Sequence, residues 1–130
     1  MPRSTHQAAG VGGTVELFED YRAGLKDLEG FSHVILIWQF DRSVGYHLEA
    51  RPPKQTDSKG VFATRSPNRP NPIGLSIVRL ERIENGVLHV NGVDMLDGTP
   101  LLDIKPYIPV TDSIPDAVPG WLGDRGKRKA

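Results

Sequence analysis

Three prolines between residues 64 and 74 constrain what this chain can fold into more than any other feature. Each proline fixes its own φ and disfavours the helical conformation for the residue before it, so the segment is predicted to be a stiff loop. The same segment carries two arginines and two asparagines: Arg65, Asn68, Arg69 and Asn71. Guanidinium and amide groups held on a stiff frame suit a carboxylate, a phosphate or the edge of a base. A binding loop is therefore favoured over a plain connector between strands.

The composition limits the classes of function. The chain has 130 residues, the length of one ordinary domain, so residues 1–130 are expected to form a single domain with a flexible start (1–13) and an irregular tail (110–130). Its 16 basic and 16 acidic residues cancel, so the overall charge does not by itself indicate a polyanionic partner, and such a partner would need a local basic patch. The absence of cysteine excludes disulfides and thiolate metal sites. No apolar run reaches the length of a membrane span, so a cytoplasmic protein with no membrane partner is expected.

The first half of the chain predicts two strands and one short helix. Residues 14–18 alternate and are rich in β-forming side chains, which is typical of a strand. Apolar side chains then recur at helical spacing as far as Gly30, which predicts a helix over 18–30. Residues 31–40 are apolar on both faces, so this long strand is expected to be central and covered on both sides.

The second half predicts an antiparallel sheet. Strands are expected at 60–63, 75–83, 87–95 and 101–105. Asn85 and Gly86 stand between two of them, and this pair is the strongest short signal for a hairpin. The tail is expected to be anchored by Tyr107 and Trp121. Because short turns join most strands and the edges need protection, the expected fold is all-β: a small antiparallel β-barrel with one short helix.

The histidines and the known sequence motifs exclude several classes of site. The histidines at positions 6, 33, 47 and 89 have no ligand pair at helical or turn spacing, so no metal is expected and His33 is given a structural role. Dinucleotide and P-loop motifs are absent. The turn at Asp97 has two equally favoured interpretations: Asp97 caps its own turn, or it contacts a small polar ligand. Asp103 is expected to pair with Lys105 or with an arginine of the proline-rich loop.

Three sequence segments resemble the signature of the TsaA-like (TrmO) family. They are GVFATRSPNRPNPIGLS at 60–76, DGTPLLDIKPY at 97–107 and LKDLEGFSH at 25–33. Their order also fits, and the similarity covers roughly residues 15–109. The resemblance implies a β-barrel methyltransferase that uses S-adenosylmethionine, works as a homodimer and binds the methyl donor near the subunit interface. In the tRNA-modifying members, the acceptor is N6 of a threonylcarbamoylated adenosine beside the anticodon.

The resemblance also implies which residues contact the methyl donor. They are Pro2, Arg3, Ser4, Phe40, Asp41, Arg65, Leu75, Leu96, Asp97, Gly98 and Thr99. The chemistry agrees, since Arg65 suits the carboxylate of S-adenosylmethionine and Asp97 suits its ribose. In a dimer, Asn68, Arg69 and Asn71 are expected to contact the substrate and to complete the site of the other subunit. Methyl transfer depends mainly on alignment, and no general base is assigned.

Three differences from the family pattern bear on the function. The chain begins almost at the Pro-Arg stretch, so the first barrel strand is expected to be missing or replaced. Ser4 stands where the family commonly has glutamine. The small C-terminal domain of the longer tRNA-modifying members has no counterpart in this sequence. Two hypotheses about the function therefore remain open. The first is methylation of tRNA. The second is methylation of a small molecule, or donor binding without RNA activity.

Overall fold

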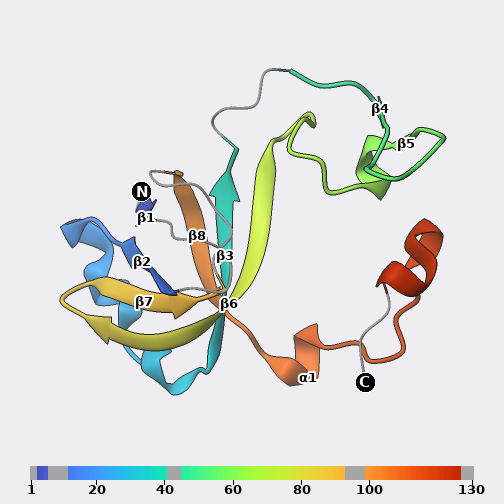
Figure 1. The fold of residues 1–130 in the computed structure, drawn as a ribbon. Coiled ribbons are helices and arrows are strands. Elements are labelled where there is room, and N and C mark those ends of the chain that lie inside the picture. The colour runs from blue at the N-terminus through green and yellow to red at the C-terminus, as the bar shows by residue number, and fades with distance from the viewer. Residues whose placement is uncertain (1–2, 6–11, 41–44, 93–98, 127–130) are drawn as a thin grey trace.

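The computed structural model describes residues 3–5, 12–40, 45–92 and 99–126, and its centre is one six-stranded antiparallel sheet (Figure 1). The strand order is β1-β2-β7-β6-β3-β8. The strands are β1 Arg3–Thr5, β2 Gly12–Glu16, β3 His33–Gln39, β6 Ile73–Glu84, β7 Val87–Asn91 and β8 Leu101–Pro106. A second, two-stranded sheet pairs β4 Glu49–Ala50 with β5 Lys59–Gly60. The antiparallel, mostly β architecture expected from the sequence is confirmed.

Strand β6 joins the two halves of the large sheet. Its residues 73–79 pair with β3 and its residues 79–84 pair with β7, and the register against β7 shifts between Leu80 and Arg82. A register shift of this kind bends and twists a strand. Figure 1 shows the result, because β6 turns from the upright group with β3 and β8 into the flat group with β2 and β7. The sheet therefore curls around its own core.

The core follows from alternation along the strands. In β3, Val34, Leu36 and Trp38 are buried, while Ile35 and Ile37 are only half-buried. Side chains of successive strand residues point to opposite faces, so one face of β3 meets the core and the other faces outward. The buried cluster gathers Val15, Leu17, Leu25, Val34, Leu36, Trp38, Val78, Leu80, Leu88, Val90 and Leu101. The sequence predicted that β3 is covered on both sides. This prediction is wrong, because the rest of the chain fully covers only one face of the strand.

The hairpin between β6 and β7 forms where the sequence predicted it. Asn85 has φ 51° and Gly86 has φ 76°, so both residues of the turn are left-handed. A two-residue turn with two positive φ angles matches the twist of the strands that it joins, and asparagine followed by glycine adopts it most readily. The turn fixes the register of Glu84 against Val87.

Two expectations about local structure need correction. The helix over 18–30 is two 3₁₀ helices, η1 Glu19–Leu25 and η2 Leu28–Gly30, because Asp27 has φ 70° and interrupts the helical path. The strand expected at 60–63 ends at Gly60 and continues as η3 Val61–Ala63, where the amide and the hydroxyl of Thr64 both donate to the Val61 carbonyl.

Short elements of regular structure lie near both ends of the chain. Near the N-terminus, β1 pairs antiparallel with β2, so residues 3–5 supply a strand at one end of the strand order. In the tail, α1 Pro109–Asp112 and η4 Gly120–Gly126 are helical. Strands β1 and β8 are the two ends of the observed strand order, and closure of the sheet into a barrel stays a prediction.

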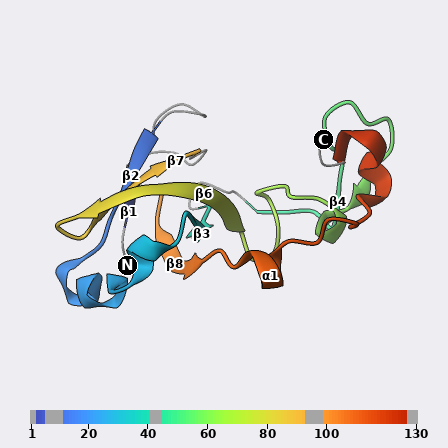
Figure 2. The same cartoon turned by 90° about the horizontal axis from the view of Figure 1, so that it is seen from below.

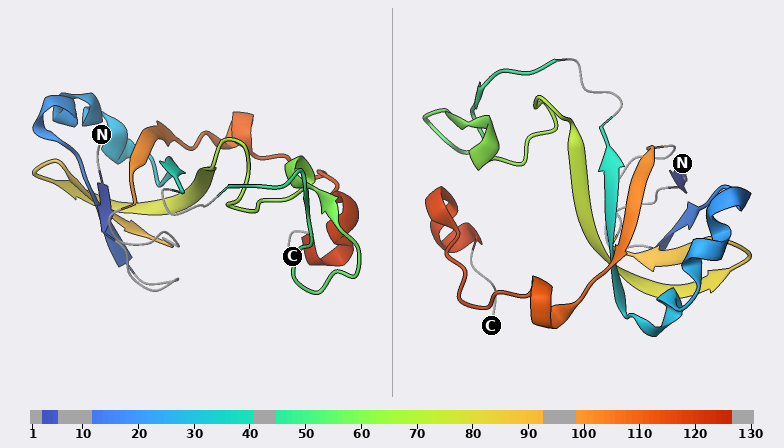
Figure 3. Two further views of the ribbon diagram at one scale, coloured as in Figure 1. Left: turned by 90° about the horizontal axis from the view of Figure 1, so that it is seen from above. Right: turned by 180° about the vertical axis from the view of Figure 1, so that it is seen from behind.

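A second region, here called the outer lobe, stands apart from the large sheet. It consists of residues 49–63, with β4, β5 and η3, together with η4. The views from below and from above place it at one end of the molecule and the sheet at the other (Figures 2 and 3). The proline loop, residues 64–72, leads from η3 into β6, and the segment after α1 leads to η4. The proline loop therefore lies between the two regions.

Candidate functional site

A cavity of about 570 Å³ lies where the proline loop meets the large sheet. Its wall combines the end of β3, the proline loop and the first residues of β6. The lining residues are Trp38, Phe40, Thr64, Arg65, Pro67, Arg69, Ile73, Gly74 and Leu75. A volume of this size falls in the range of sites for small ligands. We call it the junction cavity.

Backbone hydrogen bonds hold the cavity walls together. The Phe40 amide donates to the Pro72 carbonyl at 2.7 Å, which ties the end of β3 to the proline loop. The Gln39 amide donates to the Pro100 carbonyl at 3.0 Å, which ties the same strand end to the start of β8. The end of β3 is therefore held from two sides, and the walls are placed before any ligand enters.

Two aromatic rings form the inner wall. Trp38 and Phe40 are two residues apart at the end of β3, and their rings meet edge to face with centroids 4.4 Å apart. The Trp38 indole N–H donates to the Ser76 hydroxyl at 3.1 Å, which fixes the indole. Opposite Trp38 in the register is Gly74, where a Cβ would lie 2.6 Å from the Trp38 ring. Only glycine leaves room for the indole at this position.

Arg69 stabilises the shape of the proline loop. Its guanidinium donates to the Thr64 carbonyl at 2.8 Å and to the Ser66 carbonyl at 3.3 Å. The Ser66 hydroxyl in turn accepts the Asn68 amide at 3.2 Å. Arg69 lines the junction cavity, yet it also bridges two carbonyls of its own loop, so the residue has a structural function whatever binds there.

Arg65 differs from Arg69 in its surroundings. Its side chain is exposed and lines the junction cavity, and none of the residues that the structure describes forms a hydrogen bond or ion pair with it. A guanidinium on a stiff loop with no internal partner offers five donors to an incoming anion. The cavity thus combines a cationic rim with an aromatic wall.

The structure brings together three of the donor-site residues named from the sequence: Phe40, Arg65 and Leu75. Thr99 is 5% exposed and stands two residues before the start of β8, outside the cavity lining. Arg3 and Ser4 lie in β1, at the far end of the strand order from β8. Pro2, Asp41, Leu96, Asp97 and Gly98 lie outside the described residues. Asn68 and Asn71 are exposed on the proline loop and do not line the cavity.

Trp38 and Gly74 were missed by the sequence reasoning. A signal was available, since Trp38 is two residues before Phe40 and residues two apart in a strand share a face. A glycine inside a strand also often marks a close approach of another group. What the sequence could not show is the register that places Gly74 opposite Trp38.

Other polar groups named from the sequence have structural partners. His33 Nδ1 lies 2.7 Å from the Ser32 hydroxyl, and its ring meets Tyr107 edge to face. Asp103 forms an ion pair with Lys105 at 3.0 Å, as expected. Over the described ranges, no three histidine or acidic side chains are grouped to hold a metal ion. No helix in those ranges is long and apolar enough to cross a membrane.

Comparison with known proteins gives consistent results. Residues 1–113 match the family model described as tRNA-methyltransferase O N-terminal domain. A probable S-adenosyl-L-methionine-binding protein of Pyrococcus abyssi is 48% identical over 122 residues, which cover 94% of this chain and 66% of the relative. The tRNA (adenine(37)-N6)-methyltransferase of Mus musculus is 44% identical over 100 residues, covering 75% of this chain and 23% of the relative.

Solved structures agree in fold. A crystal structure of TrmO superimposes with a TM-score of 0.75 at 41% identity and covers 92% of this chain and 59% of its own. A crystal structure of TrmO from Pseudomonas aeruginosa gives 0.73 at 38% identity, with 92% and 58% covered. The chain thus spans less than two thirds of the length of these relatives. By the match of the family model and by these likenesses, the chain belongs to the TrmO N-terminal domain family.

Proposed function

We propose that residues 1–130 act as one domain of a cytoplasmic methyltransferase that uses S-adenosylmethionine and methylates N6 of a modified adenosine beside the tRNA anticodon. The observation that carries this proposal is the junction cavity, which is lined by the Trp38 and Phe40 rings and by Arg65, a guanidinium with no partner among the described residues. The Pyrococcus relative, named as a probable binding protein for this donor, supports the cofactor. The mouse relative, named as a tRNA methyltransferase, supports the acceptor.

The cavity residues fit the donor chemically. Arg65 would pair with the carboxylate of the methionine moiety through charge-assisted hydrogen bonds. Trp38, Phe40 and Leu75 offer aromatic and aliphatic surface to the adenine, and an aromatic ring face also attracts a cation such as a sulfonium. When bound, the donor would supply a methyl carbon to the N6 lone pair, with the carbon–sulfur electron pair remaining on sulfur and the N–H proton passing to water.

The task of the protein in this reaction is alignment. The end of β3 is tied to the proline loop and to β8 by backbone hydrogen bonds, so the walls that hold the donor are rigid relative to one another. Holding nucleophile, methyl carbon and sulfur in line supplies most of the rate in such a transfer. In the sequence, Asp41 follows Phe40, and Asp97 and Gly98 precede Thr99, so all three are close to residues joined by these two hydrogen bonds. We propose that Asp41, Asp97 and Gly98 make further contacts with the donor.

We further propose that the protein works as a homodimer. The outward face of β6 carries Ile73, Leu75 and Ile77, which are 48%, 46% and 51% exposed. Ile35 and Ile37 of β3 lie opposite Ile77 and Leu75 on the same face and are half-buried. A continuous apolar face of this kind is commonly covered by a partner, and a second copy of the chain is the proposed one. Since Leu75 belongs to this face and to the junction cavity, the interface would border the donor site.

Methyl transfer from labelled S-adenosylmethionine tests the proposal. The protein is incubated with total tRNA and with tRNA that lacks the threonylcarbamoyl group, over a range of salt concentrations. Label is expected in the first RNA alone, and it should fall as salt rises because the phosphate contacts weaken. Absence of label in RNA at every salt concentration would overturn the tRNA acceptor. Label in a small metabolite, or donor binding without transfer, would then favour the alternative functions.

A further inference from the structure

A second cavity, of about 410 Å³, lies on the other side of the proline loop. Three segments line it: residues 50–53 after β4, residues 63–67 of the proline loop region, and residues 121–122 of η4. It shares Thr64, Arg65 and Pro67 with the junction cavity. The two cavities are therefore neighbours, and Arg65 stands in the wall between them. We call the second one the lobe cavity.

The described lining of the lobe cavity is cationic. Arg51 and Arg65 both belong to it, and no acidic side chain is among the lining residues that the structure describes. Within the described ranges, neither guanidinium has a hydrogen bond or ion pair to another residue. Two unpaired guanidinium groups around one cavity favour a ligand with a negative group, because each can form paired hydrogen bonds with a carboxylate or phosphate.

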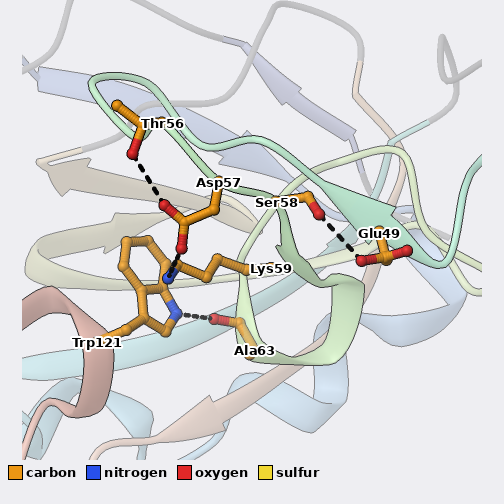
Figure 4. A network of polar contacts seen from close by, with 7 residues as sticks. All are labelled: Glu49, Thr56, Asp57, Ser58, Lys59, Ala63 and Trp121. Carbon is orange, nitrogen blue, oxygen red and sulfur yellow. Dashed lines mark hydrogen bonds and ion pairs between the residues drawn. The ribbon is translucent and has the colours of Figure 1, made fainter.

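Much of the remaining cavity wall is apolar. Pro52, Pro53 and Leu122 contribute aliphatic surface, and Trp121 contributes an indole. Figure 4 shows how that indole is held: its N–H donates to the Ala63 carbonyl at 2.7 Å, and the Lys59 ammonium lies 5.6 Å from the ring centroid. Lys59 is itself paired with Asp57 at 3.3 Å. A fixed indole beside two prolines suits a planar heterocycle.

We propose that the lobe cavity receives the methyl acceptor, a purine that carries an anionic group, with Arg51 binding the anion and Trp121 contacting the base. This inference rests on the proposed function, since it assigns the donor to the junction cavity and the acceptor to its neighbour. The anion can belong to the base, as the carboxylate of a threonylcarbamoyl group, or to the sugar, as a phosphate. Arg65, shared by both cavities, would then bring donor and acceptor side by side.

Quenching of tryptophan fluorescence tests the site directly and without turnover. The probes are N6-threonylcarbamoyladenosine, adenosine monophosphate and adenosine, added to the full chain and to Trp121→Phe. The difference between the two proteins reports on Trp121, because Trp38 is present in both. The threonylcarbamoyl nucleoside is expected to quench the wild type and to leave Trp121→Phe largely unquenched. If adenosine monophosphate quenches more strongly, the anion belongs to the sugar; equal binding of adenosine would overturn the role of the arginines.

Arg51→Gln separates this site from the donor site. It is expected to weaken binding of the anionic nucleoside about tenfold or more, while calorimetry with S-adenosylmethionine is unchanged, because Arg51 lines the lobe cavity alone. Arg82→Gln is the matched control, since Arg82 is paired with Glu84 beside the hairpin and lines neither cavity. Wild-type affinity for the nucleoside in a folded Arg51→Gln protein would overturn the site.

The two proposals fail in distinguishable ways. Methyl transfer that proceeds with an unchanged KM for the acceptor in Arg51→Gln would leave the methyltransferase intact and remove the lobe cavity as its acceptor site. Quenching that depends on Arg51, in a protein that transfers no methyl group to any RNA, would leave the nucleoside site intact and remove the proposed activity.

Discussion

The large sheet and the outer lobe are held together by different interactions. The sheet encloses a cluster of almost fully buried aliphatic side chains, including Leu36, Leu88 and Val90. The outer lobe contributes one core residue, Val61, and is otherwise joined by polar contacts such as the Trp121 hydrogen bond to Ala63. Burial of apolar surface is the main stabilising term in folding, whereas exposed polar contacts contribute little. The sheet therefore determines stability, and the lobe can serve binding.

The position of the arginines fits this division. Arg51 and Arg65 lie in or beside the outer lobe, without partners among the described residues, and both face cavities. On strand β6 of the sheet, by contrast, Arg79 pairs with Glu81 at 3.7 Å and Arg82 pairs with Glu84 at 2.6 Å. Elements that bind ligands are commonly drawn from the less stable parts of a structure. Substitutions in the two regions should consequently have different effects.

Leu36→Ala should have the largest effect on stability. The side chain is fully buried in the middle of β3, and removal of such a leucine costs about 2–5 kcal/mol through lost burial and the cavity left behind. Urea unfolding should show this loss in a cooperative transition. Leu48→Ala, at a leucine that is 65% exposed, is the control and should change stability little. A Leu36→Ala protein as stable as the control would contradict the assignment of the core.

Gly74→Ala should affect stability and donor binding together, because Gly74 lies where the sheet meets the junction cavity. The new Cβ would lie 2.6 Å from Trp38 and 3.1 Å from Phe40, so both rings must shift. Overpacking of this kind typically costs about 1–3 kcal/mol. Thermal unfolding and calorimetry with S-adenosylmethionine measure the two effects. Gly60→Ala, with no atom within 4 Å of its new Cβ, should change neither.

Trp121→Phe should loosen the outer lobe and spare the sheet. It keeps an aromatic ring but removes the N–H donor to Ala63, a contact worth about 1 kcal/mol. Proteolysis within residues 49–63 and 120–126 should become faster, while the urea midpoint of the sheet changes little. A loss of global stability as large as that of Leu36→Ala would show that the lobe belongs to the same cooperative core.

The smallest expected effect in the outer lobe is a change in the pKa of Asp57. The hydrogen bond from the Thr56 hydroxyl, followed by the contact with Lys59, lowers the pKa of the Asp57 carboxyl. With a lowered pKa in the folded state, the contribution of Asp57 is present above the ordinary aspartate pKa and is lost as the pH falls through the lower, folded value. NMR titration should place the midpoint below the ordinary value, and Thr56→Ala should raise it. An unshifted midpoint in the wild type would contradict the contact.

The sequence predicted the sheet well because its signals are local. Alternation along β6 and β7, with Asn85 and Gly86 between them, was enough to predict the hairpin. The helix was harder, since the apolar spacing over 18–30 does not reveal that Asp27 adopts a left-handed conformation and divides the segment into two 3₁₀ turns. The sequence also did not predict that the outer face of β3 is half-exposed. An apolar strand has the same residue pattern whether this chain or a partner covers its outer face.

The candidate site was only partly predictable. The stiffness of the proline loop follows from its prolines, and Phe40, Arg65 and Leu75 were named from the family resemblance. The role of Arg69 within the loop was missed, because its hydrogen bonds to two nearby carbonyls depend on the path of the backbone. The sequence named Trp121 as an anchor, and this is confirmed, but its partner Ala63 is 58 residues away and no local pattern connects them. Cavities built from distant segments require the structure.

Calorimetry of S-adenosylmethionine with Arg65→Ala tests the central claim most directly, because the donor carboxylate is proposed to bind the guanidinium of Arg65. Loss of a charge-assisted pair is worth roughly 1.5–3 kcal/mol, so donor affinity should fall by up to about a hundredfold. The fold should be unchanged, since Arg65 is exposed and has no partner among the described residues. Arg82→Ala is the matched control and should bind as the wild type does. Wild-type donor affinity in a folded Arg65→Ala protein would contradict the account.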